Sequence, residues 1–481
     1  MLKKLFLCIS LHFIALQSFC IPKKPLLQFK ISRPYSVINF LEASTGAMGT
    51  SDALKEYIKS NTAGDTAYSK LIRRYQLIEL SIIYQRTGFP ESRPSYRSTK
   101  DLLMIQAIQS NSINEFKQSA AGILHNTDFL NLIDIMVEAD QFYQKLIWSK
   151  YSQAALHQLS MLKKHEGSAN DAFIKLKKFY NSAWGNDMPF IVTMVPVPGH
   201  SGGTSATPHA NSLCIDVLTD ETKYAERVGI TMHEIAHVLY AEQSREVQSQ
   251  LESCFSRNSS VNSQPTHHFI DEGLATACGN GWMYHMLTHK IDSEGWYDNE
   301  YIEGLGRAIY PMVSQYILQG KSIDQSFIDE AIRLFGEKFP KASMEYGIQI
   351  NHLTLYADEE RPIERQQISQ DLRSQFMVSW LNFSSPILGP ESLNFLKNNE
   401  GTQLIIIDRH PEPTLQALRS TLPDLNTINY NLNENFIINY FDSSHRLIII
   451  AKTNEGESSL LFKALKEKRY VTTGETYWKW K

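Results

Sequence analysis

The feature that most constrains this chain is a pair of histidines one helical turn apart within a run of uncharged residues. The run Ile230–Leu239 contains the pattern His233-Glu234-x-x-His237. Residues four positions apart lie on one face of an α-helix, so both imidazoles can bind a single metal ion. The pattern predicts a buried metal-binding helix in which Glu234 takes a proton from a water on the metal. The plainer alternative is a helix with two surface histidines.

A catalytic site of this kind needs a third protein ligand and one position left open for water. The extended pattern, in which glycine and histidine follow the second histidine, is excluded because those positions hold Tyr240 and Gln243. The segment Phe269–Ala277 offers a better ligand in Glu272, which opens a predicted helix of small residues. Small residues allow close packing against a neighbouring helix, and close packing brings a carboxylate within bonding range of a metal on that helix.

The residues leave alternatives open for the third ligand. Asp271 and the neighbouring pair His267 and His268 could bind the metal themselves, or orient the residues that do. An ordinary carboxylate, favoured near the start of a helix by the helix dipole, is the plainer explanation of Glu272. We therefore expect Glu272 to be the third ligand, and Asp271, His267 and His268 are the alternatives.

At these motifs the chain resembles the gluzincin metallopeptidases, the thermolysin-like and peptidase-MA-like group. In that group the third ligand is a glutamate on a later helix, often within the pattern Glu-Gly-x-Ala. The resemblance covers roughly residues 185–340 and implies hydrolysis of peptide bonds in a peptide or protein substrate, with Glu234 as the general base. It also implies one zinc ion per chain, bound by His233, His237 and Glu272.

A phenol or imidazole is wanted in such sites to stabilise the oxyanion as water adds to the carbonyl. The segment 308–318 loosely resembles a tyrosine-bearing helix often found after the glutamate helix in this group. Tyr316 stands where phenylalanine is expected, and Gln319 where a second tyrosine is expected. The resemblance makes Tyr310 the candidate catalytic tyrosine and Tyr316 the second choice. A tyrosine packed in a core is the plainer interpretation of each.

Two further functions are compatible with these residues. The chain could be an exported peptide-binding protein that retains a non-catalytic zinc site. Glu234 argues against this, because a purely structural site has no use for a base beside its water. The chain could also be a metal-dependent hydrolase of a non-peptide bond.

The first 20 residues have the layout of a cleaved signal peptide. A short, positively charged N-terminal segment precedes a largely apolar run, Leu5–Phe19. This run is shorter than the roughly 20 residues that a membrane-spanning helix needs. A lipid-modified Cys20 is the alternative, but Gln17 and Phe19 are poor neighbours for that cleavage site. No later segment is long and apolar enough to span a bilayer. We expect an exported protein, periplasmic or secreted, with no integral membrane segment after signal cleavage.

Net charge and cysteine content limit the partners and the disulfides that we expect. The formal net charge of −4 gives no basic field, so we expect no nucleic-acid partner, and nothing indicates an oligomeric state. Cys8 and Cys20 lie in the predicted signal, which leaves Cys214, Cys254 and Cys278 and allows one disulfide at most. A Cys254–Cys278 bridge would tie the two ligand helices together, and buried unpaired cysteines are the alternative.

The whole pattern predicts an α+β fold that is mainly helical. We expect a gluzincin-like metallopeptidase core with a small β-sheet, preceded by a helical region and followed by a small α/β accessory domain. The expected boundaries are 1–20 for the signal peptide, 21–185 for the helical N-terminal region, 186–385 for the core and 386–481 for the accessory domain. Apolar periodicity predicts helices at 52–58, 71–84, 100–109, 129–151, 172–183, 301–319 and 326–335.

Two predicted strands, 190–197 and 212–218, precede the metal-binding helix and flank a glycine-rich loop at 198–208. By the gluzincin resemblance, a small sheet borders the cleft and 190–197 is an edge strand that binds an extended peptide. His200 and His209 could touch substrate, but solvated loop histidines are the plainer interpretation.

The accessory domain should alternate strands at 402–408, 436–441 and 446–451 with helices at 413–419 and 458–468.

Overall fold

The computed structural model describes residues 26–47, 49–88, 93–200, 204–358, 362–399, 401–472 and 474–480. The predicted signal peptide, residues 1–20, lies outside these ranges. The described chain is α+β and 57% helical, with small mixed sheets, which confirms the predicted class. It divides into two compact units: Met1–Glu252 with Asp271–Phe327, and Ser253–Ile270 with Ile328–Lys481.

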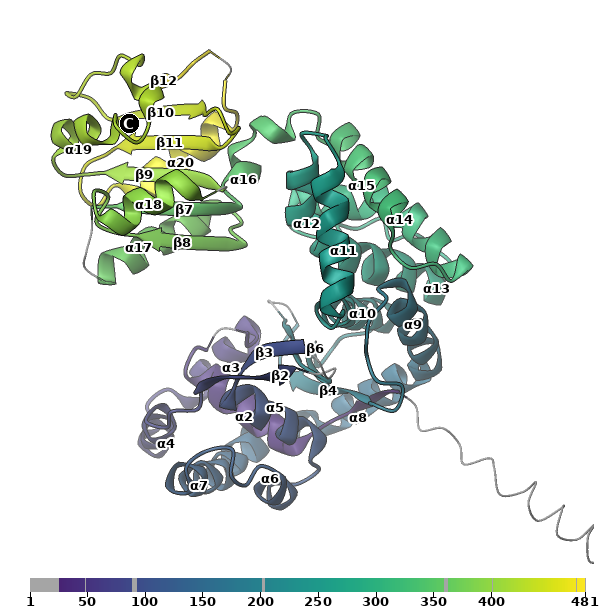
Figure 1. Cartoon of the computed structure of the whole chain (residues 1–481). Helices are drawn as coiled ribbons and strands as arrows, with labels where there is room; N and C mark the ends of the chain where they lie inside the picture. Colours follow the sequence, from purple (N-terminus) through teal and green to yellow (C-terminus); the bar gives the residue numbers. More distant parts are fainter. Residues whose placement is uncertain are drawn as a thin grey trace, which may run out of the picture. The chain divides into compact units, whose positions relative to one another are not determined.

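The first unit contains a four-stranded sheet in the order β1-β4-β6-β5. Its strands are β1 (Leu27–Lys30), β4 (Phe190–Val197), β5 (Ala206–His209) and β6 (Ser212–Leu218). Two of its strands, β4 and β6, are labelled in Figure 1. The first three strands in that order run parallel, whereas β5 pairs antiparallel with β6. The central strands β4 and β6 are almost wholly buried, which requires cover on both faces of the sheet.

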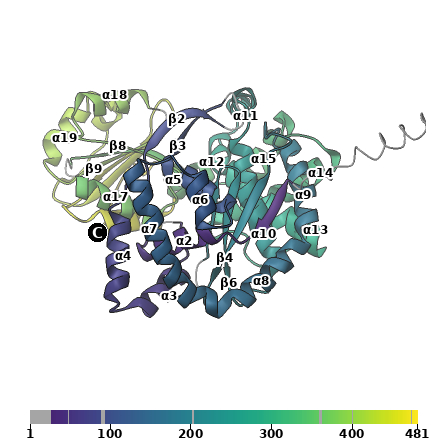
Figure 2. The ribbon, with the colours of Figure 1, turned by 90° about the horizontal axis from the view of Figure 1, so that it is seen from below.

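Helices that lie between β1 and β4 in the sequence supply part of this cover. They are α2 (Arg33–Ser44), α3 (Asp52–Thr62), α4 (Thr66–Gln76), α5 (Thr99–Gln109), α6 (Ile113–Ser119), α7 (Asn126–Tyr143), η1 (Gln144–Trp148), α8 (Ser149–Lys164) and α9 (Glu166–Phe179). In Figure 2, α2 lies among α3, α4 and α7. Val195, Val197 and Cys214 join the apolar core of these N-terminal helices. The helices α8 and α9 contact β1, and α8 also contacts β4.

The helices between β6 and β7 include those that carry the predicted site. Among them are α10 (Tyr224–Ala241), α11 (Arg245–Arg257), α12 (Ser263–Thr276), the π-helical segment η2 (Ala277–Met283), α13 (Tyr284–Thr288), α14 (Glu300–Gln319) and α15 (Gln325–Lys338). None of the described helices combines the length and apolar character needed to cross a bilayer.

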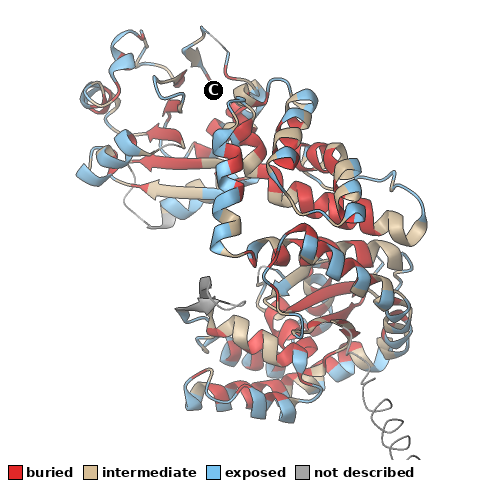
Figure 3. Cartoon of the chain, turned by 45° about the vertical axis from the view of Figure 1, so that its right-hand side comes forward, coloured by how far each residue is buried: buried red, intermediate tan, exposed pale blue. Residues whose placement is uncertain are grey.

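The second unit contains a six-stranded sheet in the order β12-β10-β11-β9-β7-β8. Its strands are β7 (His352–Ala357), β8 (Trp380–Ser384), β9 (Thr402–Ile407), β10 (Phe436–Phe441), β11 (Leu447–Lys452) and β12 (Tyr477–Lys479). Two short helices, η3 (Ala342–Met344) and α16 (Tyr346–Gln349), precede β7. The helices between the strands are α17 (Pro362–Gln375), α18 (Pro390–Asn398), α19 (Pro411–Leu418), η4 (Pro423–Asn426) and α20 (Ser458–Lys468). Alternate residues of β9 enter two separate apolar cores, Leu404 and Ile406 in one, Ile405 and Ile407 in the other. Both faces of this strand are therefore buried. Figure 3 colours buried residues red, among them residues of several strands.

Several sequence expectations differ from the structure. The helix predicted over 71–84 ends at Gln76, and Ile83–Gly88 forms β2, paired with β3 (Arg93–Ser98). The residues after Gln76 place Ile78, Leu80 and Ile82 at every second position, a spacing that suits extended chain. The strand predicted as an edge, β4, lies between β1 and β6.

The division of the chain also differs from the predicted domains. The expected boundary at 185 separates β1 from β4, yet these strands pair in one sheet. The expected boundary at 385 separates β7 and β8 from β9, yet β7 lies between the other two in the second sheet. Each expected boundary thus separates strands of one sheet, because pairing between distant segments is not visible in local periodicity.

The cysteine bridge considered from the sequence is not formed. Cys214, Cys254 and Cys278 are buried, and no disulfide joins any two of them. The sulfur of Cys278 lies 3.7 Å from the hydroxyl of Tyr180 instead. The two ligand helices are therefore held by packing rather than by a covalent link.

Truncating Ile449 should destabilise the second unit selectively. This side chain is fully buried in the second sheet, and removing three carbons of a buried isoleucine costs about 2–5 kcal/mol. Ile449→Ala should lower the calorimetric unfolding temperature of the second unit, while the metal content of the protein stays unchanged. Leu460→Ala is the control, because Leu460 is 50% exposed on α20. Loss of metal in the Ile449 variant would contradict the division into two units.

Candidate metal centre

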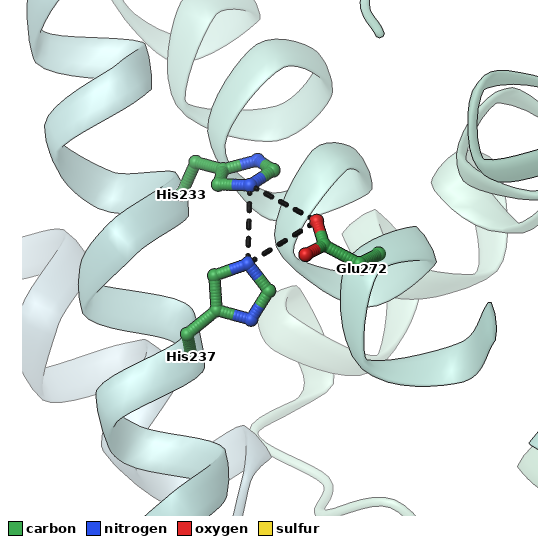
Figure 4. A group of neighbouring side chains, drawn as sticks. All are labelled: His233, His237 and Glu272. Carbon is green, nitrogen blue, oxygen red and sulfur yellow. Dashed lines mark hydrogen bonds and ion pairs between the residues drawn. The ribbon is translucent and has the colours of Figure 1, made fainter. Parts of the chain in front are cut away.

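The two histidines of the motif lie one turn apart on α10 and point to the same side of the helix (Figure 4). Their Nε2 atoms are 3.2 Å apart. The helix is anchored beneath them by apolar residues on its inner face: Val228, Met232, Ile235, Ala236 and Leu239. The spacing of the motif thus produces the shared face that the sequence predicts.

Glu272 completes the group from the facing helix α12. Its Oε2 atom lies 3.5 Å from Nε2 of His233 and 3.3 Å from Nε2 of His237. Tetrahedral coordination with bonds of about 2.1 Å places neighbouring ligand atoms about 3.4 Å apart. The triangle of two nitrogens and one oxygen therefore has the size that a small metal ion requires.

The chemistry of this group also suits a metal ion. Oε2 of Glu272 is buried and has no hydrogen-bond partner among the described residues. Burial works against its ionised form, but the ion pairs with both histidines hold the pKa of Glu272 well below its usual range. An ionised carboxylate oxygen aimed between two imidazole nitrogens is a group that could hold a metal ion.

Two glycines let the ligand helices approach each other. Gly229 of α10 faces Gly279 of η2, directly after α12. A Cβ added at Gly279 would lie 2.5 Å from the carbonyl oxygen of Gly229 and 2.7 Å from Cβ of His233. Atoms at these distances clash, so only glycine fits between the helices here. This close approach brings Glu272 to the histidines.

Asp271 acts on the metal group indirectly. Its Oδ1 atom lies 3.0 Å from Nδ1 of His237, on the side of the ring away from the other ligands. Burial opposes a charge on His237, but the carboxylates of Asp271 and Glu272 raise its pKa to about 10. Such a carboxylate fixes the orientation of the imidazole and increases its basicity. Asp271 is therefore placed to orient a ligand.

Glu234 lies beside the three ligands and lines a cavity of about 190 Å³. The other residues lining this cavity are Thr204, Ser205, Ala206, Ile215, Asp216, Arg227 and Ile230. Burial raises the pKa of Glu234, although the two nearby histidines oppose the rise. A carboxylate whose pKa lies closer to neutrality is a better general base than an exposed one.

A residue that sequence reasoning missed, Tyr297, lies next to the metal group. Its ring stacks on that of His233, with centroids 6.1 Å apart and an angle of 20° between the planes. Burial raises the pKa of Tyr297, and the negative charge of Glu272 and a hydrogen bond to it raise the pKa further. The phenol thus stays protonated and can donate a hydrogen bond. No motif marks Tyr297, because it lies in the loop between α13 and α14.

The predicted tyrosines lie elsewhere in the first unit. The hydroxyl of Tyr310 is 3.1 Å from Nδ1 of His285, and its ring packs edge-on against Trp296. Tyr316 donates a hydrogen bond to Asp324 at 3.0 Å. Among the described contacts, neither tyrosine touches the three ligands or Glu234. The catalytic role of Tyr310 stays a prediction, and its geometry gives that role no support.

The other histidines considered from the sequence have separate contacts. His267 packs against Phe255, and His268 stacks on His352. His200 is exposed and pairs with Asp220 at 2.7 Å, as expected for a loop histidine.

His209 corrects the expectation of a solvated loop residue. Its side chain is only 11% exposed and lies at the end of β5, close to Asp101 and Tyr35. The glycine-rich loop contains β5 from Ala206 onward. The strand escaped prediction because it is only four residues long and includes a proline.

Filling the glycine contact should weaken metal binding. Gly279→Ala forces α10 and η2 apart, which displaces His233 relative to Glu272. We expect the affinity for zinc, measured by competition with a chromophoric chelator, to fall at least tenfold. Gly295→Ala is the matched control, since a Cβ there has no atom within 4 Å. Equal affinities in the two variants would show that the glycine contact does not set the ligand geometry.

Comparisons with known proteins leave the function to be argued from this geometry. No protein family, no curated protein and no solved structure matches the chain. The assignment of a chemistry therefore rests on the residues of the site, which is where function resides in any fold.

Proposed function

We propose that this protein is an exported zinc metallopeptidase. The observation that carries the proposal is the group of His233, His237 and Glu272, whose ligand atoms lie 3.2–3.5 Å apart with Glu234 beside them. Two nitrogens and one oxygen are a frequent ligand set of catalytic zinc. The layout of residues 1–20 supports the proposed export.

The chain's own residues have separate tasks in this proposal. Bound zinc would supply Lewis acidity, which polarises the scissile carbonyl and makes water a better nucleophile. Glu234 accepts the proton of the attacking water and passes it to the leaving amine. Tyr297 donates a hydrogen bond to the oxyanion that develops on the carbonyl. Asp271 keeps the ring of His237 in its ligating orientation.

The sheet of the first unit supports a peptide as the substrate. Its edge strand β5 contacts α10, and Ala206 of β5 lines the cavity that also contains Glu234. An exposed strand edge can bind an extended peptide through main-chain hydrogen bonds, and an adjacent cavity can take a side chain. This role falls to β5 rather than to β4, which is internal to the sheet.

Replacing the proposed base should separate metal binding from turnover. Glu234→Gln preserves the shape of the side chain but cannot accept a proton. We expect one zinc per chain, measured by atomic emission, and a loss of turnover of at least a thousandfold on a peptide library. Glu272→Ala is the companion variant and should lose the zinc itself.

Three results would redirect the proposal. Full activity of the Glu234 variant would refute the assignment of the base. Stoichiometric zinc in the wild-type protein without peptide turnover would favour a peptide-binding protein or a hydrolase of another bond. Zinc retained in Glu272→Ala would exclude Glu272 as an essential ligand.

A comparison of two tyrosines should identify the residue that stabilises the oxyanion. Tyr297→Phe removes the hydroxyl next to the ligands and should lower kcat about a hundredfold, with zinc content unchanged. Tyr310→Phe removes a hydroxyl bonded to His285 and should change kcat less than threefold. Steady-state kinetics on one peptide checks both variants. The reverse order of effects would restore Tyr310 as the catalytic tyrosine.

A further inference from the structure

The loop that carries Tyr297 is anchored at several points. Residues 290–299, here called the tyrosine loop, join α13 to α14 and contain no helix or strand. A long irregular segment of this kind has no internal ladder of hydrogen bonds to hold its shape. The position of Tyr297 therefore depends on contacts from the rest of the first unit.

Arg307 of α14 supplies two of these contacts through the loop backbone. Its guanidinium donates to the carbonyl oxygen of Asp292 at 3.2 Å and also to that of Glu294. The remaining Nε–H donates to Glu303 at 2.9 Å, which fixes the plane of the guanidinium. A planar group with fixed donors can hold two carbonyls at once, whereas an ammonium acts as a single point charge.

Trp296, the residue directly before Tyr297, is held in both backbone and side chain. Its amide donates to Glu303 at 3.3 Å, and its indole N–H donates to the carbonyl oxygen of Asp292 at 3.0 Å. The guanidinium of Arg307 lies over the indole ring, 4.4 Å from its centroid. The indole is only 5% exposed, so this cation–π contact is shielded from water.

Gly281 leaves space for the indole ring of Trp296. A Cβ added at Gly281 of η2 would lie 2.9 Å from the ring of Trp296 and 2.7 Å from that of Tyr310. The loop is also tied to the start of the ligand helix, because Glu294 pairs with Lys223 at 3.2 Å. The same loop thus contacts α10, η2 and α14.

We propose that Arg307 is a positioning residue that holds the tyrosine loop and thereby fixes the phenol of Tyr297 beside the metal group. This inference rests on the proposed peptidase function and adds to it a residue whose guanidinium acts only through Tyr297. A hydroxyl displaced by about 1 Å loses most of its stabilisation of a developing charge, a loss of up to about a hundredfold in rate. Tyr310 then belongs to the packing around Trp296, which accounts for its place in the fold.

The test combines hydrogen exchange with kinetics on the full-length protein. Arg307→Gln should increase amide exchange in residues 292–297 at least tenfold and lower kcat at least tenfold, with KM within twofold of the wild type. Arg307→Lys keeps the charge but loses the two-point contact, so it should recover only part of the rate. Arg333→Gln is the control, because the ion pairs of Arg333 with described residues are those with Glu330 and Glu337 on its own helix.

A double variant separates positioning from a general loss of structure. If Arg307 acts through Tyr297, Arg307→Gln should reduce kcat less than twofold when Tyr297 is already phenylalanine. An equal loss of rate in both backgrounds, or unchanged exchange in the tyrosine loop, would overturn the proposal. A wild-type protein that binds zinc but hydrolyses no peptide would refute the peptidase function, and hydrogen exchange would then still decide whether Arg307 holds the loop.

Discussion

The contact between two glycine backbones is the constraint on which the site depends. Gly229 and Gly279 lie where α10 meets η2, and any side chain at Gly279 would collide with the opposite helix. Glycine in a helix costs up to about 1 kcal/mol relative to alanine, so this contact is made at the expense of local helix stability. In return, a carboxylate on one helix comes within 3.5 Å of two imidazoles on the other.

Electrostatics around this contact favours a cation at the centre of the group. Asp271, Glu272 and Glu234 place three carboxylates around His233 and His237, and all five residues are at least partly buried. Bringing several carboxylates out of water is costly unless positive charge compensates them. Part of that compensation comes from a proton on His237, whose raised pKa reflects its two acidic neighbours. A divalent ion would compensate the charge more fully.

The parts of the site that sequence reasoning predicted are those that depend on local geometry. His233, Glu234 and His237 share one helix, so spacing alone relates them. Glu272 could be identified because small residues around it indicate close helix packing. Tyr297 could not be identified, because its position is set by a loop whose shape depends on Arg307 and Trp296. In the second unit, the strands predicted at 402–408, 436–441 and 446–451 and the helices predicted at 413–419 and 458–468 agree with β9, β10, β11, α19 and α20. The strands β7, β8 and β12 and the helices α17 and α18 were not predicted.

Local sequence patterns could not predict which distant strands pair with each other. Phe29 of β1 pairs with Val192 of β4, across more than 160 intervening positions. Hydrophobic periodicity describes which face of a segment is buried but not which segment covers it. The four-residue strand β5 was hidden in a glycine-rich stretch for the same reason, since its pairing with β6 defines it.

The pairing of β1 with β4 also bears on how such a protein could mature. Proteolytic removal of a pro-segment is one way in which proteins are activated. Here the leading segment contributes a parallel strand to the sheet, and its helices share an apolar core with Val195, Val197 and Cys214. Excising it would expose one face of the sheet next to the ligand helix. The N-terminal helices are thus an integral part of the folded unit.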